Sequence, residues 1–363
     1  MCAFAVFGTQ LQAAAPPQNK VNPSERALGP LSIKVYDDRM TIAMAGAAQV
    51  YLSGVIDLDA PERFAALLKS WKIPPDSDIY LNASGDDIDA GMALGRLLRS
   101  GSMSTHLGKP TRGARSKQGD KSSVCTGACV YTYLGGVYRW VPTGNDRFGI
   151  TSYPAEPSKD APTAQLTSRI TAYLKNMGVA PAAFATLQAA AHNGVSWPSA
   201  DQMVVSRLAN NGRQPLIASY RVSGGIPHLE LDQIRRRGEQ RITLQCKPGS
   251  ILLTAYNKVG LDRAQQIVKH ATRSYVEIDR IETLSQTIGG AILDLDAVVV
   301  DRTWPPDQLD KLLSAKSLGA WINQPNGRLR YGFAFRMDGI DRVLKAFHDG
   351  CGKYAPAPIK SRS

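Results

Sequence analysis

The apolar positions of residues 31–212 follow two periods in alternation, which predicts strands that alternate with helices. Apolar residues recur at helical spacing in Pro61–Trp71 and Asp87–Ser100, so each segment is expected to form an amphipathic helix. The predicted strands are Ile33–Tyr36, Thr41–Ala45, Val50–Ile56, Ser77–Asn82, Met103–Leu107, Tyr138–Val141 and Arg147–Thr151. Strands that alternate with helices indicate an α/β domain with a parallel sheet and right-handed crossovers.

Four more helices are expected in the same domain. Gly135-Gly136 should end the first of them, and Ser199 should cap the start of the last. The four predicted helices are Val124–Leu134, Thr163–Met177, Pro181–His192 and Ser199–Leu208.

The pattern changes after Asn210, where Gly212 and Pro215 are typical of a domain boundary. We interpret residues 213–240 as a linker, 241–352 as a smaller α+β domain and 353–363 as a tail. Asn326-Gly327 predicts a tight hairpin between Ala320–Asn323 and Leu329–Phe335. The other predicted strands are Arg241–Cys246, Ile251–Tyr256 and Ile292–Val300, and the predicted helices are Leu261–Ala271, Pro306–Lys316 and Asp338–His348.

The N-terminus resembles an export signal. Residues 1–15 run from an apolar stretch into Ala13-Ala14-Ala15, as in the core and cleavage site of a signal peptide. The positively charged front end is missing, which is consistent with a truncated signal, and residues 16–30 are expected to be a linker. Removal of the signal with Cys2 would leave four cysteines, an even number that suits an oxidising compartment. We therefore expect a periplasmic or secreted protein.

The charge balance favours an anionic partner. The chain has 43 basic and 31 acidic residues, a formal net charge of +12. Residues 108–123 are polar and strongly basic, so they should form an exposed loop, either a clamp for an acidic protein or anionic ligand, or a solvated flap. Its cations are Lys109, Arg112, Arg115, Lys117 and Lys121. Nucleic acid is not expected as a partner, because no binding module is present. No apolar run is long enough to span a bilayer, and no cofactor or metal motif is found.

Four landmarks carry a more specific signal. They are Leu81-Asn82-Ala83-Ser84-Gly85-Asp86 before a helix, Cys125-Thr126-Gly127-Ala128-Cys129 before Gly135-Gly136, Arg147-Phe148-Gly149-Ile150-Thr151, and Trp197-Pro198-Ser199-Ala200-Asp201-Gln202. In this order and spacing they resemble the Clp protease/crotonase superfamily, most closely its periplasmic Clp protease-like branch. The resemblance covers roughly residues 32–210 and implies a βαβ fold of that type.

The resemblance also implies where catalytic residues should lie. The nucleophile position falls on Gly127, the base on Thr151 and the second oxyanion-loop glycine on Asp86. Glycine has no side chain to attack with, threonine is not a base near neutral pH, and a carboxylate opposes an oxyanion. We therefore expect a non-catalytic protein that binds another macromolecule as an inhibitor, immunity-type protein or scaffold. The alternative is an active periplasmic serine hydrolase or peptidase with an unrecognised nucleophile. Ser84 is more typical of a turn, and the hydroxyl of Thr126 would point away from the site on a helix. The oligomeric state is open.

The cysteines allow two disulfides. Cys246 ends a predicted strand and Cys351 follows the last predicted helix, so a bond between them would close a long loop of the second domain. Cys125 and Cys129 lie too far apart on a regular helix for an unstrained bond. They could bond if the helix begins after Cys125, and otherwise they are two buried thiols; both interpretations are open at this stage.

Overall fold

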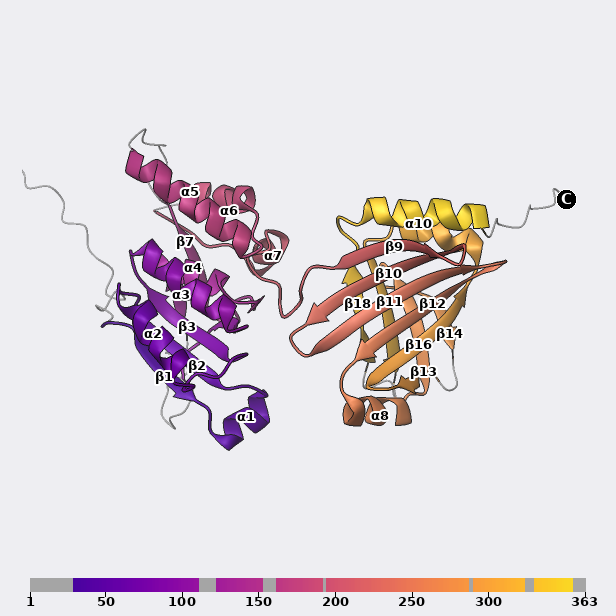
Figure 1. The fold of residues 1–363 in the computed structure, drawn as a ribbon, viewed down its shortest axis with the longest axis horizontal. Coiled ribbons are helices and arrows are strands. Elements are labelled where there is room, and N and C mark those ends of the chain that lie inside the picture. Colours follow the sequence, from indigo (N-terminus) through magenta and orange to yellow (C-terminus); the bar gives the residue numbers. More distant parts are fainter. Residues whose placement is uncertain are drawn as a thin grey trace, which may run out of the picture.

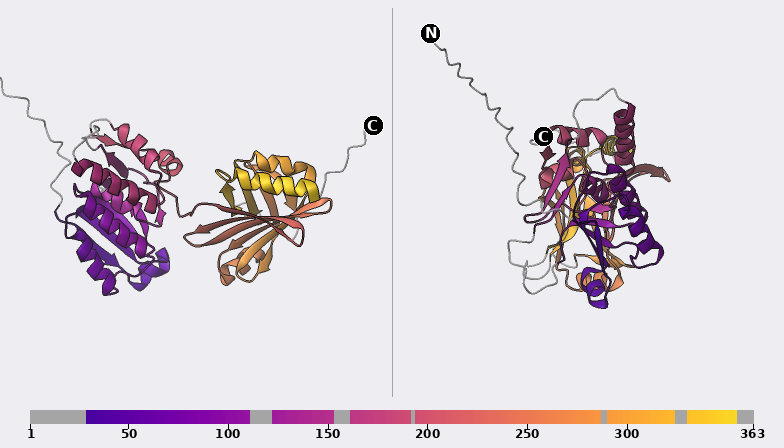
Figure 2. Two further views of the ribbon diagram at one scale, coloured as in Figure 1. Left: turned by 45° about the horizontal axis from the view of Figure 1, so that its top comes forward. Right: turned by 90° about the vertical axis from the view of Figure 1, so that its left-hand side faces the viewer.

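Two bodies make up the computed structural model, which describes residues 29–110, 122–152, 161–191, 194–286, 290–323 and 330–354. They are joined by the single connection between helix α7 (Ala200–Val205) and strand β9 (Ile217–Ser223) (Figure 1). The separation of the two bodies is also visible from a second direction (Figure 2). The predicted fold class, an α/β domain followed by an α+β domain, is confirmed.

The first domain has an eight-stranded mixed sheet. Its interior strands are parallel, and its edge strands β1 and β8 pair antiparallel. The strands are β1 (Ser32–Tyr36), β2 (Gln49–Val55), β3 (Asp78–Ser84), β4 (Ser104–Leu107), β5 (Val124–Thr126), β6 (Tyr138–Arg139), β7 (Arg147–Thr151) and β8 (Val195–Ser196). The helices are α1 (Arg39–Ala45), α2 (Ala60–Lys69), α3 (Ile88–Ser100), α4 (Ala128–Leu134), α5 (Ala161–Asn176), α6 (Pro181–Ala189) and α7.

The two faces of this sheet differ. Helices α2, α3 and α4 cover one face (Figure 1), where Ile79 and Leu81 are fully buried in the core. Because side chains alternate along a strand, Tyr80 lies on the opposite face. There the parallel register sets Tyr80 between Tyr51 and His106, and the three rings stack with centroids 4.8 Å apart. Trp140 extends the row beyond His106.

The second domain has a six-stranded and a four-stranded antiparallel sheet. Helix α10 lies along strands β9 to β11 (Figure 1) and buries Phe347 against a core that includes Leu244 and Trp304. The strands are β9, β10 (Ile226–Arg235), β11 (Gly238–Lys247), β12 (Ser250–Lys258), β13 (Arg273–Ile278), β14 (Ile281–Gln286), β15 (Ile292–Asp294), β16 (Ala297–Trp304), β17 (Ser317–Asn323) and β18 (Arg330–Arg336). The helices are α8 (Leu261–Lys269), the short 3-10 turn η1 (Pro306–Gln308), α9 (Leu309–Leu313) and α10 (Asp341–Tyr354).

Residues 213–240 are not a linker, contrary to the prediction. They contain β9 and β10, which pair antiparallel across Gly224 and Gly225. Both glycines have positive φ, 59° and 81°, as a tight two-residue hairpin requires. Leu229 and Leu231 are fully buried on the inner face of β10. The second domain therefore begins at β9.

Two further predictions of secondary structure are wrong. Thr41–Ala45 was expected to be a strand but lies in α1, because the Asp38 carboxylate caps the helix by accepting from the backbone N–H and the hydroxyl of Thr41. Ile292–Val300 is two strands, β15 and β16, and not one. Strands β13 and β14 were not predicted. Ser199, by contrast, is the predicted N-cap of α7 and forms a capping box with Gln202.

The predicted signal peptide, residues 16–28 of the predicted linker and residues 355–363 of the predicted tail lie outside the described residues. The tail was predicted to begin at Lys353, but Lys353 and Tyr354 still belong to α10. Among the described helices, none has the length and apolar character needed to cross a membrane.

Candidate functional site

The segment expected to carry the nucleophile is a strand-to-helix turn. The predicted helix Val124–Leu134 is shorter at its start, because Val124–Thr126 is strand β5 and α4 begins at Ala128. Gly127 joins them with φ 60° and ψ −126°, a conformation that residues with a side chain rarely adopt. Cys125 is thus extended backbone and Cys129 is helical, and a disulfide joins them over a Cα–Cα distance of 5.3 Å. The bond ties β5 to α4 across Gly127.

The oxyanion position next to this turn is already occupied. In acyl-transfer enzymes of the expected type, the backbone N–H after the nucleophile binds the oxyanion. Here the corresponding N–H, that of Ala128, donates to the carbonyl oxygen of Gly85 at 2.6 Å. A Cβ atom added at Gly127 would collide with the same carbonyl oxygen. The peptide group of Gly85 therefore leaves no room for a side chain at position 127. The same group also occupies the Ala128 N–H that would bind an oxyanion.

Asp86 and Thr151 lie on either side of this turn. Asp86 is exposed between β3 and α3, and its neighbour Asp87 caps α3 by accepting from the N–H of Ala90 at 2.8 Å. Thr151 ends β7, and its carbonyl oxygen accepts from Gln188 Nε2 at 3.0 Å. Neither residue is paired with a histidine in the described part of the chain.

His106 is too far away to activate a hydroxyl at this turn. It is the one histidine among the described residues of the first domain, and it pairs in register with Tyr80. Ser84 lies four residues further along β3, which is roughly 13 Å at the usual rise of a strand. The ring of His106 is stacked between Tyr80 and Trp140.

Only the two ends of the predicted basic loop, residues 108–110 and 122–123, belong to the described residues. Lys109 lies in the described region after β4, whereas Arg112, Arg115, Lys117 and Lys121 lie outside the described residues. The other predicted disulfide is present: Cys246 of β11 is bonded to Cys351 of α10, with a Cα–Cα distance of 5.7 Å. The residues that could hold a metal do not cluster anywhere in the described ranges.

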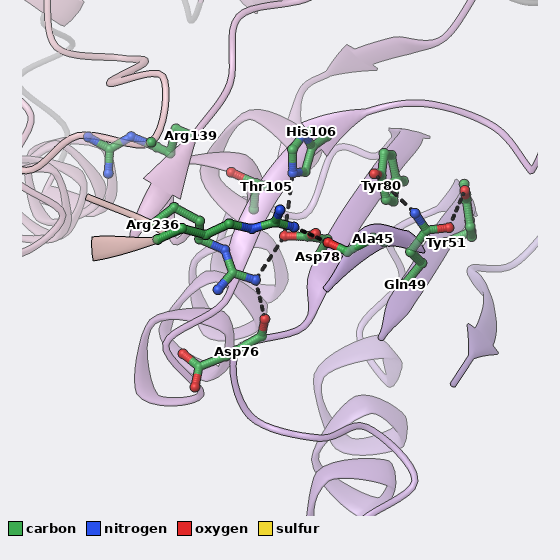
Figure 3. A network of polar contacts seen from close by, with 12 residues as sticks. Ala45, Gln49, Tyr51, Asp76, Asp78, Tyr80, Thr105, His106, Arg139 and Arg236 are labelled. Atoms are coloured by element: carbon green, nitrogen blue, oxygen red, sulfur yellow. Dashed lines mark hydrogen bonds and ion pairs between the residues drawn. The ribbon is translucent and has the colours of Figure 1, made fainter. Parts of the chain in front are cut away.

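The tip of the β10–β11 hairpin makes a polar contact with the first domain (Figure 3). Arg236 donates to the carboxylate of Asp78 at 3.1 Å and to the backbone carbonyl of Asp76. Asp78 also faces His106, whose Nε2 lies 3.6 Å from the same carboxylate oxygen. Burial alone would raise the pKa of Asp78, but the contacts with His106 and Arg236 outweigh it, so the pKa lies below the ordinary 3.8. Sequence analysis missed this contact, although Arg235-Arg236-Arg237 was the signal for it.

We expect Asp78→Asn to loosen the contact between the domains by about 2 kcal/mol, because it removes a charge-assisted hydrogen bond. Since the folded pKa is lowered, the wild-type contact should persist at neutral pH and be lost only as the pH falls through that lowered pKa. Small-angle scattering should show a larger radius of gyration for the variant at pH 7. Asp76→Asn is the matched control, because only the backbone of Asp76 contacts Arg236; equal scattering from both variants and the wild type would contradict this role.

Arg139 is the most completely buried cation of the first domain, with 4% of its surface exposed. Burial, together with the charge of nearby Arg99, lowers its pKa to about 10, so it stays charged at neutral pH. Within the part of the chain that the structure describes, its guanidinium donates to no carboxylate but to five backbone carbonyl oxygens, at the ends of α4, α5 and α7. These belong to Leu134, Gly136, Met177, Arg207 and Leu208. Cations are favoured at helix C-termini, where the last carbonyls lack partners.

Comparisons with known proteins give a structural likeness and no sequence relative. No family model matches the chain, and no curated protein matches it. A variant of ClpP1 from Listeria monocytogenes is 16% identical, with a TM-score of 0.34 over 47% of this chain and 94% of that one. ClpP1 from the same organism is 15% identical, with a TM-score of 0.33 over 45% of this chain and 88% of that one. A variant of the 1510-N membrane-bound stomatin-specific protease is 14% identical, with a TM-score of 0.30 over 45% of this chain and 75% of that one. The chain is thus similar in structure to ClpP and to this stomatin-specific protease over about half of its length.

Proposed function

We propose that this protein is a non-catalytic member of the Clp protease-like folds and serves as a binding protein. The observation that carries the proposal is the hydrogen bond from Ala128 N–H to the Gly85 carbonyl oxygen, which occupies the donor that an oxyanion would need. The absence of a side chain at Gly127 and the alcohol at Thr151 support it, because neither supplies a nucleophile–base pair.

The proposed partner is a protein or an anionic ligand of the cell envelope. The net charge of +12 supports an anionic partner, because a basic surface attracts acidic groups at long range. The Cys125–Cys129 and Cys246–Cys351 disulfides favour an oxidising, extracytoplasmic compartment. A periplasmic location is part of the proposal.

Restoring the missing hydroxyl should not restore activity. We expect Gly127→Ser to give no hydrolysis of ester or peptide substrates and no labelling by a fluorophosphonate probe, because the base is missing and Gly85 still blocks the oxyanion donor. The variant should also lose about 2 kcal/mol of stability, because its Cβ must displace the Gly85 carbonyl. Substrate turnover and chemical denaturation measure the two effects.

Gly127→Ala is the matched control, because it adds the same Cβ without a hydroxyl and should lose as much stability. The proposal is wrong if the wild-type protein hydrolyses these substrates and loses that activity in Ser84→Ala or Thr126→Val. Those variants would then identify the nucleophile of an active hydrolase.

A further inference from the structure

A cleft separate from the turn at Gly127 lies where the two domains and their connection meet. Its volume is about 870 Å³, within the usual size of small-molecule sites. The first domain supplies one wall, β10 and the end of β18 supply another, and residues 209–216 of the connection lie between them. The cations that line it are Arg99, Lys175 and Arg207, with Arg139, Arg213, Arg235 and Arg336, against a single carboxylate, that of Asp338.

Three of these cations already have partners. Arg99 and Arg139 donate to backbone carbonyls, and Arg336 forms an ion pair with Asp338 at 2.6 Å. The other four have no ion pair within the described part of the chain: Lys175, Arg207, Arg213 and Arg235. The cleft therefore has a surplus of positive charge that the protein itself does not neutralise.

The fold sets two of these cations, Arg213 and Arg235, opposite each other. They face each other in an isolated antiparallel β-bridge between the connection and β10. Loss of hydration lowers the pKa of both guanidinium groups, and the charge of Arg213 lowers that of Arg235 further. Two like charges held side by side are unfavourable unless an anion lies between them, and arginine pairs bind carboxylate and phosphate oxygens in fork geometry.

The remaining lining combines apolar side chains with the amides of Asn176, Asn210, Asn211, Gln214 and Gln233. Val205, on α7, leaves 72% of its surface exposed at this cleft, an unusual position for a large aliphatic side chain. Trp140 lines the same cleft, and its buried indole Nε1 has no hydrogen-bond partner among the described residues. The other apolar lining residues are Val137, Val141, Met177, Val204, Ala209, Pro215 and Leu216.

We propose that this interdomain cleft binds an anionic amphiphile, a molecule with a phosphate or carboxylate head and a hydrocarbon body. Arg213 and Arg235 would bind the head, with Lys175 and Arg207 contributing charge, and the valine-rich wall would cover the body. This inference rests on the proposed binding role but names its ligand class. Different results would contradict the two proposals. Hydrolysis of esters would overturn the non-catalytic role, whereas the ligand of the cleft is tested by binding measurements alone.

Titration calorimetry of the full chain with octyl phosphate, octanoate and inorganic phosphate tests the cleft. We expect one molecule of octyl phosphate or octanoate to bind per chain, and Arg213→Gln with Arg235→Gln to weaken binding by roughly tenfold or more, as loss of charge-assisted hydrogen bonds predicts. Inorganic phosphate should bind more weakly, because it lacks the apolar body. If it binds as tightly as octyl phosphate, the site is a simple anion site and the amphiphile assignment is wrong.

Two controls separate the cleft from general charge and from surface adsorption. Arg342→Gln with Lys353→Gln removes the same charge from exposed positions of α10 and should leave binding unchanged. Octyltrimethylammonium has the same chain with a cationic head and should not bind. Equal weakening by both double variants, or saturable binding of the cationic amphiphile, would overturn the proposal. Val205→Asp should weaken octyl phosphate binding more than phosphate binding, and equal effects would also contradict it.

Discussion

Replacing Arg139 with methionine should lower the free energy of unfolding of the first domain by about 4 kcal/mol. The methionine fills a similar volume but removes the printed donor of three backbone carbonyl oxygens, those of Gly136, Arg207 and Leu208. The carbonyl oxygens of Leu134 and Met177 lose one of their two donors, because Arg99 still donates to both. The carbonyls that lose their donor follow α4 and α7, so the loss should be concentrated where these two helices end. Urea denaturation followed by circular dichroism measures the effect.

Arg39→Met is the matched control, because it makes the same substitution at an exposed position in α1 of the same domain. It should change stability by less than about 0.5 kcal/mol. Arg139→Lys should recover only part of the loss, because an ammonium group cannot reproduce the planar fork of donors. A loss below about 1 kcal/mol in Arg139→Met would show that water or a shifted backbone satisfies these carbonyls instead.

Removal of the Cys246–Cys351 disulfide by paired substitution with alanine should cost about 4–5 kcal/mol. The bond spans 105 residues, and in the chain-entropy model a long closed loop restricts the unfolded state strongly. Denaturation without reductant should show the loss in the transition of the second domain. Peptide mapping of the wild-type protein, without reduction, should recover the two cysteines in one linked pair.

The Cys125–Cys129 bond is an internal control for that explanation. It spans four residues, so paired alanine substitution should cost only about 2 kcal/mol by the same model. Equal losses for the two bonds would show that loop length does not determine their contributions. In that case, the contacts of the buried sulfur atoms would have to account for the effect.

The order of helices and strands in the first domain could be predicted because most segments there carry a clear apolar period. The prediction failed where a local signal outweighed the pattern. Thr41–Ala45 alternates like a strand, but the Asp38 cap makes it helical. Gly224-Gly225 was available as a hairpin signal, but its position after a boundary of Pro and Gly residues favoured the wrong interpretation, a linker.

The candidate site could also be predicted only in part from the sequence. The landmarks around Gly127 could be found from sequence because their spacing along the chain is local. The hydrogen bond between the Ala128 amide and the Gly85 carbonyl depends on how two loops meet in the fold. No residue type in the sequence predicts it. Arg139 and the Arg213–Arg235 bridge bring together groups far apart in the sequence, so only the fold reveals what surrounds them.

Under the proposed non-catalytic role, the peptide between Gly85 and Asp86 would also make it difficult to engineer an active site at this turn. A serine at position 127 has no room until that peptide turns over, and turning it over gives no benefit while position 127 lacks a nucleophile. Each change alone is costly or useless, and a base must be supplied as well. An engineered active site would therefore have to rebuild the loop, the nucleophile and the base together.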